Sequence, residues 1–253
     1  MNKFLTIALE AARESEKVIL EYFDESGVSV EMKSDNSPVT VADKKAEHVI
    51  HEVVRSYFPD HGFLGEETEE SDTNSEYTWI VDPIDGTRNY SHGIPIFDTQ
   101  IALMKGEELI LGVSNAPALR ELLYAEKGKG AYCNDAKIHV SSVQDIDKAF
   151  ISFGGIRHFE QKKLTVGLVS LANAVNGDHG FGDFWSYTLV ARGSMDIMID
   201  PKVNIWDVAA LTVILEEAGG VMTDTAGGPI TKKVQSVIAS NGILHARALS
   251  CFN

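Results

Sequence analysis

Two aspartates and a proline follow directly on strand-forming residues in the segment WIVDPIDGTRNY, residues 79–90. The apolar WIV favours a buried strand, whereas Pro83 cannot donate a further ladder hydrogen bond, so the strand is predicted to end at Asp82. Because open α/β sheets bind ligands beyond the carboxyl ends of their strands, Asp82 and Asp85 are expected to face one cavity. Their carboxylates, with the Ile84 carbonyl, are ligands that Mg²⁺ prefers.

Two further acids occupy comparable places. Glu66 follows the short apolar stretch HGFLG, and Asp207 lies in the first turn of the apolar stretch NIWDVAAL. Each acid also has a simpler interpretation. The DPIDG segment is typical of an Asx turn, Asp207 of a helix-dipole partner near an Asn204 cap, and Glu66 of the solvated start of an acidic loop.

The residues after the acid pair are suited to binding an anion. A helix that begins at Gly86 and Thr87 would direct free backbone N–H groups and a hydroxyl at it. Acids for a metal ion, followed by donors for a phosphate group, indicate metal-assisted phosphate chemistry. The sequence contains neither the P-loop pattern GxxxxGK[ST] nor CxxxxxR nor HExxH. We therefore expect this chemistry to use metal ions and water.

The elements that must position these residues follow from hydrophobic periodicity. A first helix is predicted to about Phe23, stopped by Gly27, and a second from a capping pair, Thr40 and Asp43, to about Tyr57. The stretches 34–40 and 66–77 are typical of a turn and an exposed acidic loop. Strands are predicted at 78–81, 97–104, 109–114, 121–125, 149–153, 196–200 and 234–240, and further helices at 184–192 and 205–218.

This order of elements favours a layered α+β architecture. We expect one domain over residues 1–253, with a sheet-rich half at about 1–144 and a smaller α/β half at about 145–253.

Charge and composition exclude several classes of protein. The chain has 22 Lys and Arg against 37 Asp and Glu, a formal net charge of −15, which repels nucleic acids and anionic membranes. No run approaches the ~18 apolar residues of a membrane span, and early acids interrupt any signal-peptide core. Cys133 and Cys251 lie far apart, without a CxxC pattern. We expect a cytoplasmic protein that binds neither nucleic acid nor membrane.

Three segments, GEE (65–67), WIVDPIDGTRNY and WDVAALTVILEEAGG (206–220), resemble in their order and separation the signature segments of the inositol monophosphatase superfamily. The resemblance extends to VTVADKKAE (39–47) and GKGAYCN (128–134), and covers nearly the whole chain. It implies the layered α/β/α/β/α sandwich of the inositol monophosphatase and fructose bisphosphatase type. It also implies two to three Mg²⁺ ions, sensitivity to Li⁺ and a homodimer.

The resemblance further implies a role for each acid. The expected metal ligands are four carboxylates and one carbonyl: Glu66, Asp82, Ile84, Asp85 and Asp207. The first ion would use all of them except Asp207, the second would use the three aspartates, and a third, weaker ion would lie near Glu66 through water. Thr87, supported by Asp43, would position and deprotonate the attacking water, with Glu66 as a further catalytic group. Two metal ions about 4 Å apart stabilise the attacking and leaving oxygens alike.

In this superfamily, the substrate is recognised by the segment before the 184–192 helix and by the acid seven residues before Asp207. Those positions hold Asp183 and Asp200. An Asp beside an anionic phosphate pocket does not suit a neutral polyol, because its desolvation is uncompensated, but it could pair with a substrate ammonium group. The alternative for Asp183 is an N-cap of the helix.

The stretch GDFWSYTLVARG, with SNAPALRELLYA (114–125), is similar to the histidinol-phosphate phosphatases of this superfamily, whose substrate carries that amine. We therefore expect a Mg²⁺-dependent phosphomonoesterase that acts on L-histidinol phosphate in histidine biosynthesis. Inositol phosphates, phosphoadenosine or sugar bisphosphates are alternative substrates, and a catalytically silent binding protein is the alternative from another class.

The residues expected to bind the substrate are Asp85, Gly86, Thr87, Arg88, Asp183, Asp200 and Asp207. Two positions depart from the superfamily pattern. His179 stands where relatives have Arg, and Arg88 where many have Thr or Lys. Neither is an expected metal ligand.

Overall fold

The computed structural model describes residues 2–24, 30–32, 38–68 and 75–252. The predicted helix stop at Gly27, most of the turn at 34–40 and the centre of the acidic loop lie outside these ranges. The chain opens with helix α1 (Lys3–Asp24), short paired strands β1 (Val30–Met32) and β2 (Pro38–Thr40), and helix α2 (Val41–Tyr57). The predicted ends of the two helices agree with the structure within one residue. The predicted turn instead finishes in strand β2.

A seven-stranded sheet follows, in the order β3-β4-β5-β6-β7-β8-β9. β3 pairs parallel to β4, and every other pair is antiparallel. Its strands are β3 (Gly62–Gly65), β4 (Tyr77–Asp85), β5 (Asp98–Lys105), β6 (Glu108–Ala116), β7 (Glu121–Glu126), β8 (Ala131–Cys133) and β9 (Ala136–Ile138). Helix α3 (Thr87–Ser91) and the 3-10 turns η1 (Pro117–Leu119) and η2 (Ile146–Lys148) lie in the connections.

A second, five-stranded sheet has the order β11-β10-β12-β14-β13 and mixes parallel with antiparallel pairs. Its strands are β10 (Phe150–Phe153), β11 (Gly177–His179), β12 (Ile197–Asp200), β13 (Val221–Thr223) and β14 (Val237–Ser240). The helices of this part of the chain are α4 (Ile156–Gln161), α5 (Thr165–Ala172), α6 (Asp183–Ala191), α7 (Ile205–Glu217) and α8 (His245–Leu249).

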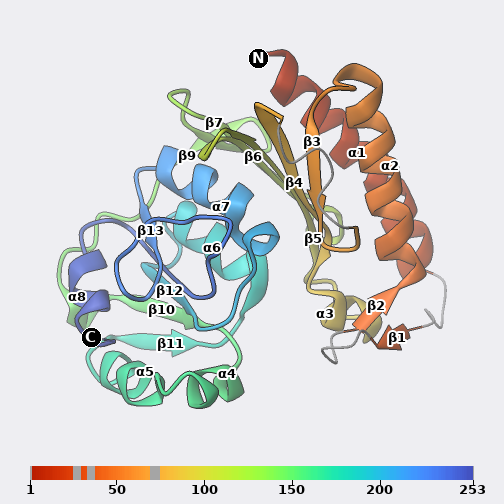
Figure 1. The fold of residues 1–253 in the computed structure, drawn as a ribbon. Helices are drawn as coiled ribbons and strands as arrows, with labels where there is room; N and C mark the ends of the chain where they lie inside the picture. Colours follow the sequence, from red (N-terminus) through yellow and green to blue (C-terminus); the bar gives the residue numbers. More distant parts are fainter. Residues whose placement is uncertain (1, 25–29, 33–37, 69–74, 253) are drawn as a thin grey trace.

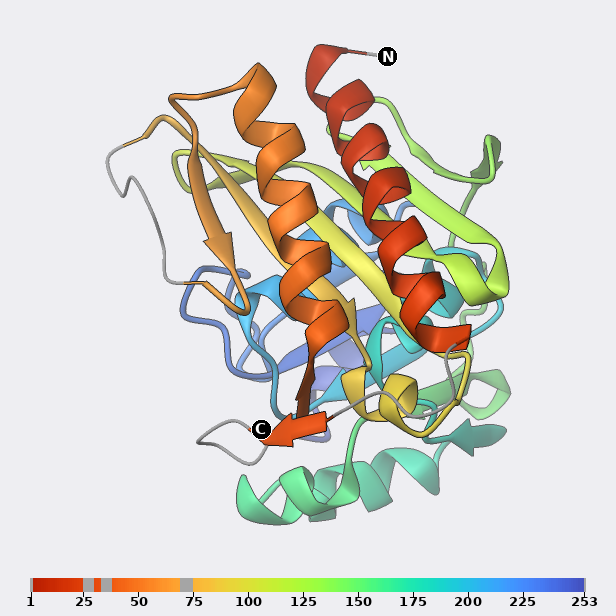
Figure 2. The ribbon, with the colours of Figure 1, turned by 90° about the vertical axis from the view of Figure 1, so that its right-hand side faces the viewer.

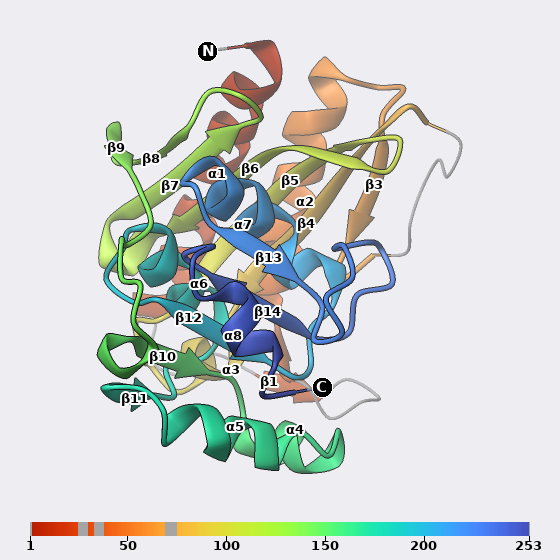
Figure 3. The ribbon, with the colours of Figure 1, turned by 90° about the vertical axis from the view of Figure 1, so that its left-hand side faces the viewer.

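The helices and sheets stack in five layers. Helices α1 and α2 cover one face of the seven-stranded sheet (Figure 2), and α6 and α7 lie between the two sheets (Figure 1). The short helices α4, α5 and α8 cover the outer face of the five-stranded sheet (Figure 3). This is the expected α/β/α/β/α sandwich. None of the helices in the described residues combines the length and apolar composition needed to cross a bilayer.

Successive side chains of a strand point to opposite faces of its sheet, so each sheet contributes to two hydrophobic cores and the layers can stack. On β12, Ile197 and Ile199 pack into the outer core, while Met198 packs into the core around α6 and α7. On β5, Ile101 faces α1 and α2, while Ala102 faces α6 and α7. Both faces of each sheet are therefore buried.

Strand β4 does not end at Asp82, as predicted, but continues to Asp85. Its pairing with β5 shifts register between these two residues, which is a bulge. The bulge accommodates Pro83, which has no N–H to donate, and the Pro83 carbonyl accepts a hydrogen bond from the Thr99 hydroxyl at 2.9 Å. The bulge therefore separates the two aspartates without ending the strand.

Candidate active site

Acidic side chains from several elements meet where α6 and α7 pack over the end of β4. Asp82 and Asp85 come from β4, Glu66 follows β3, Asp183 opens α6, and Asp207 lies in the first turn of α7. Asp82 is buried, and the other four are half-buried. We call these five residues the acid cluster.

Backbone N–H groups anchor three of these carboxylates. Ile84 N–H donates to Asp82 Oδ1 at 3.0 Å, and Phe184 N–H donates to Asp85 Oδ2 at 2.8 Å. Asn204 N–H donates to Asp207 Oδ2 at 2.7 Å, and Asn204 and Asp207 form a capping box. The predicted Asn204 cap and the place of Asp207 in the first turn are confirmed. The second oxygen of Asp85 and of Asp207 accepts no hydrogen bond from the described residues.

The acids raise one another's pKa. Burial raises the pKa of Asp82 well above its ordinary value, and the charges of Glu66, Asp85 and Asp207 raise it further. Burial and the charge of Asp183 do the same to the pKa of Asp85. Burial is also the largest cause that raises the pKa of Asp207 to about 7. Several carboxylates thus share one poorly solvated space.

The donor set fits a hard divalent cation. Within the described ranges, no three His, Cys, Asp or Glu side chains already stand in a metal-coordinating arrangement. The ligands that the cluster offers are nevertheless all oxygens, and their mutual repulsion is the kind that a divalent cation relieves. The Ile84 carbonyl, the expected neutral ligand, accepts a hydrogen bond from the Thr87 hydroxyl at 2.9 Å and keeps a second lone pair.

Thr87 lies between this carbonyl and Asp43. Its hydroxyl is 3.2 Å from Asp43 Oδ1, while Asp43 Oδ2 accepts hydrogen bonds from the Thr40 hydroxyl at 2.6 Å and the Thr40 N–H at 2.7 Å. The predicted capping box at the start of α2 is confirmed. Burial raises the pKa of Asp43. One carboxylate thus caps a helix and faces Thr87.

Asp183 does not cap α6, because Gly182 occupies the N-cap position and Asp183 is the first helical residue. Its φ of +46° is unusual for a residue with a side chain, although Asp tolerates this region. Asp183 Oδ2 accepts a hydrogen bond from Asn89 Nδ2 at 3.2 Å, and Asn89 also donates to the Ile96 carbonyl at 3.0 Å. Asn89, which was not predicted as a site residue, thus links the segment WIVDPIDGTRNY to Asp183.

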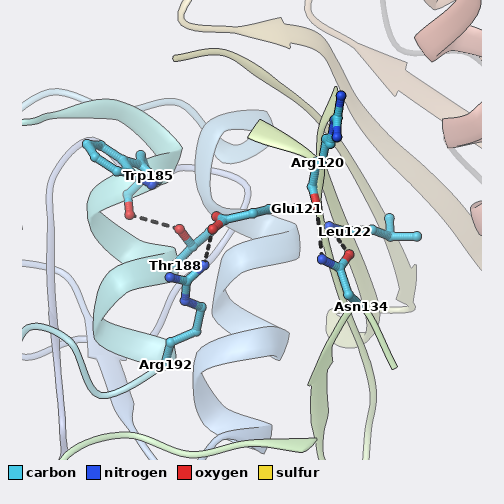
Figure 4. A network of polar contacts seen from close by, with 7 residues as sticks. All are labelled: Arg120, Glu121, Leu122, Asn134, Trp185, Thr188 and Arg192. Atoms are coloured by element: carbon cyan, nitrogen blue, oxygen red, sulfur yellow. Dashed lines mark hydrogen bonds and ion pairs between the residues drawn. The ribbon is translucent and has the colours of Figure 1, made fainter. Parts of the chain in front are cut away.

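The far end of α6 is tied to the seven-stranded sheet (Figure 4). Arg192, which follows the helix, forms an ion pair with Glu121 on β7, and both side chains are largely shielded from solvent. Beside Glu121, Asn134 accepts a hydrogen bond from Leu122 N–H at 3.0 Å and donates to the Arg120 carbonyl at 2.9 Å. Helix α6 is thus held at both ends, by Asp85 and by Glu121.

A buried acid beneath the cluster was also not predicted. Asp98, which is 0% exposed, lies opposite Asp85 in the ladder and raises the pKa of Asp85. Its Oδ2 accepts hydrogen bonds from Ser114 and Gln100, both at 2.6 Å, while Oδ1 has no partner among the described residues. The signal in the sequence was an acid at the start of the apolar stretch FDTQIALM.

The remaining predicted substrate residues border the cluster. Gly86 has a φ of +85°, and a Cβ there would lie 2.9 Å from the Ile96 carbonyl oxygen, so only glycine fits this turn. Arg88 is exposed on α3, which is only five residues long. Asp200 is buried at the end of β12, and its Oδ1 accepts a hydrogen bond from Lys202 N–H at 3.1 Å.

These pKa shifts predict how stability depends on pH without divalent cations. Burial raises the pKa of Asp200 from 3.8 to about 8, so its stabilising effect is full below pH ~4 and is lost as the pH rises through 8. In EDTA, we expect the melting temperature to fall by about 5 °C between pH 6 and 8.5, and Mg²⁺ to reverse much of this fall. Differential scanning calorimetry measures both.

Asp200→Asn should make this fall smaller, because the variant has no carboxyl group to ionise at that position, while Asp207, with a pKa of about 7, still contributes to it. Asp224→Asn, at a half-buried position in a turn outside the cluster, is the matched control and should follow the parent. Parallel profiles for the parent and Asp200→Asn would contradict the prediction.

The comparisons with known proteins cover the whole chain. Residues 1–253 match the inositol monophosphatase family model. A histidinol-phosphatase from Chlorobaculum parvum is 36% identical over 97% of this chain and 93% of its own. A fructose-1,6-bisphosphatase/inositol-1-monophosphatase from Aquifex aeolicus is 34% identical over 97% and 93%. The crystal structure of the extragenic suppressor protein suhB from Bartonella henselae matches with a TM-score of 0.93 and 31% identity, covering 100% of this chain and 99% of that one.

With this fold and these relatives, the protein is a phosphoric monoester hydrolase. The chain belongs to the inositol monophosphatase family.

Proposed function

We propose that the protein is a Mg²⁺-dependent phosphatase that hydrolyses L-histidinol phosphate to L-histidinol and inorganic phosphate, as a cytoplasmic homodimer in histidine biosynthesis. The observation that carries the choice of substrate is Asp183, which Asn89 holds beside Asp85. Relatives named histidinol-phosphatase support the same choice.

In this proposal, the acid cluster holds the metal ions through Glu66, Asp82, Asp85, Asp207 and the carbonyl of Ile84. Mg²⁺, when bound, supplies Lewis acidity that stabilises charge on the phosphate group and makes water a better nucleophile. The protein holds these oxygens close together, which raises the pKa of the carboxyl groups. Backbone N–H groups keep three of the aspartates oriented.

Thr87 and Asp43 are proposed to move the proton of the attacking water. The water gives its proton to Thr87 Oγ1 while the Thr87 hydroxyl proton passes to Asp43 Oδ1, 3.2 Å away. Burial raises the pKa of Asp43 and so makes its carboxylate a stronger base. The other Asp43 oxygen stays bound to Thr40, which keeps the carboxylate oriented.

Asp183 and Asp200 are proposed to pair with the ammonium group of the substrate. Burial raises the pKa of both carboxyl groups, and each is also close enough to other acids to interact with their charges. A neutral polyol would leave this charge uncompensated, whereas an ammonium group would neutralise part of it.

The second candidate is an inositol phosphatase or a phosphatase of broader specificity. It is favoured by relatives named fructose-1,6-bisphosphatase/inositol-1-monophosphatase and inositol monophosphatase. It uses the same acid cluster and differs only in what Asp183 and Asp200 contact.

Replacing Asp183 by Asn distinguishes the two candidates. We expect the parent to prefer histidinol phosphate to myo-inositol 1-phosphate, and Asp183→Asn to lose roughly 30-fold in kcat/KM for histidinol phosphate only, since a desolvated charge pair is broken. Steady-state phosphate release from both substrates measures this. Asp178→Asn, exposed on β11, is the matched control. A parent that prefers inositol phosphate, or a variant equally impaired on both substrates, would count against histidinol phosphate.

A further inference from the structure

Exposed cations border the acid cluster on one side. Arg88 lies on α3, Arg157 on α4 and Lys202 two residues after β12, and all three are exposed. His158, half-buried on α4, lies among them. We call these four residues the cationic collar. In the ranges that the structure describes, Arg88, Arg157 and Lys202 form no ion pair, although the chain carries a net charge of −15.

Backbone geometry places the collar beside Thr87 and Asp200, two residues at the border of the acid cluster. Arg88 directly follows Thr87, and Lys202 N–H donates to Asp200 at 3.1 Å. A Cβ at Gly154 would lie only 2.7 Å from the Asp200 carboxyl group, so the turn that leads into α4 and to Arg157 passes directly against Asp200. Helices α3 and α4 lie at the same end of the molecule (Figures 1 and 3).

Electrostatic interactions agree with this placement. Burial lowers the pKa of His158, and the charges of Lys202, Arg157 and Arg88 lower it further, so the three cations lie close enough to this ring to interact with it. Burial raises the pKa of Asp183, and Arg88 opposes that rise. The members of the collar therefore lie close to one another, and Arg88 and Lys202 lie close enough to Asp183 and Asp207 of the acid cluster to interact with their charges.

A phosphate ester that approaches this protein is a dianion that meets a strongly acidic chain. Without local compensation, its encounter with the acid cluster would be slowed, because like charges repel over a Debye length of about 10 Å at 0.1 M salt. Cations at the mouth of a site raise the local concentration and the association rate of an anionic substrate by 10-fold or more, in a salt-dependent way.

We propose that Arg88, Arg157 and Lys202 form an anion-receiving site that takes the phosphate group of the incoming ester and passes it to the acid cluster. The site recognises a phosphate dianion and not the alcohol part of the substrate. The inference deepens the proposed function, and it rests on phosphate-ester hydrolysis and not on histidinol phosphate in particular.

The double variant Arg157→Gln/Lys202→Gln tests this site, because both residues are exposed and neither is among the residues that the sequence predicted to bind the substrate. With p-nitrophenyl phosphate at low salt and saturating Mg²⁺, we expect kcat/KM to fall about tenfold, mostly through a higher KM, with kcat changed by less than about twofold. The parent's kcat/KM should fall steeply as NaCl is raised, and the variant's should fall less. Calorimetric titration of inorganic phosphate, with Mg²⁺ present and no turnover, should show the same loss of affinity.

Two variants make the result specific. Arg157→Lys/Lys202→Arg keeps both charges and should restore most of the lost affinity. Lys137→Gln/Arg247→Gln removes two exposed cations from β9 and α8 and should not reproduce the loss. A double variant whose KM, salt dependence and phosphate affinity all match the parent would overturn the proposal that these residues form an anion-receiving site. An enzyme that hydrolyses p-nitrophenyl phosphate but not histidinol phosphate would overturn only the proposed substrate.

Discussion

Replacing Asp85 by Asn is expected to lower kcat/KM for every phosphate ester by a factor of roughly 10² to 10³. In the proposed function Asp85 is a shared metal ligand, and the loss of its charge removes several kcal/mol of transition-state stabilisation. Asn is nearly isosteric, and its side-chain carbonyl can still accept the hydrogen bond that Phe184 N–H donates to Asp85 at 2.8 Å. The fold and the position of α6 should therefore survive. Initial rates over a series of Mg²⁺ concentrations measure the effect.

The variant should also respond less to Mg²⁺ in a thermal melt, since a ligand that binds the folded state raises its melting temperature. Asp224→Asn is the matched control, because Asp224 also accepts backbone N–H bonds, from Ala226 and Gly228, in a turn outside the acid cluster. Parent-like activity in Asp85→Asn would remove Asp85 from the set of metal ligands. Loss of activity with an unchanged Mg²⁺ response would indicate a role in orienting α6 instead.

The elements around the acids were predictable because each buries at least one regular face. Helix α2 has apolar residues at helical spacing and an explicit capping box, so its start and end followed from local chemistry. Helix α7 begins at an Asn204 cap and is nearly continuous in its apolar residues, which suits a helix buried between two sheets. The acids stand at the ends of such elements and could therefore be recognised together.

Other features depend on contacts distant in sequence. The α4 and α5 helices have only 6 and 8 residues, too few for a clear period, and β11 has 3. The bulge in β4 exists because β5 continues to pair with β4 on both sides of Pro83. The hydrogen bond between Asn89 and Asp183 joins residues 94 positions apart. No local pattern encodes such a contact.

Replacing Gly112 by Ala should disturb both stability and catalysis. Gly112 lies on β6, and a Cβ there would be 2.2 Å from the carbonyl oxygen of Ala210 on α7. The obstructing atom belongs to the backbone of a buried helix, so no side-chain rotation can relieve the clash. Helix α7 would have to move by about 1 Å, at a cost of about 3 kcal/mol in the free energy of unfolding. Urea unfolding measures this cost.

The same shift should reach the acid cluster, because Asp207 lies in α7 three residues before Ala210. A misplacement of about 1 Å can cost about 10²-fold in rate, so kcat should fall well beyond the loss expected from unfolding alone. Gly177→Ala on β11 is the matched control, since a Cβ there meets only the Phe150 ring, at 3.1 Å, and a ring can turn aside. If Gly112→Ala kept the parent's kcat and stability, close packing of α7 on β6 would not be what positions Asp207.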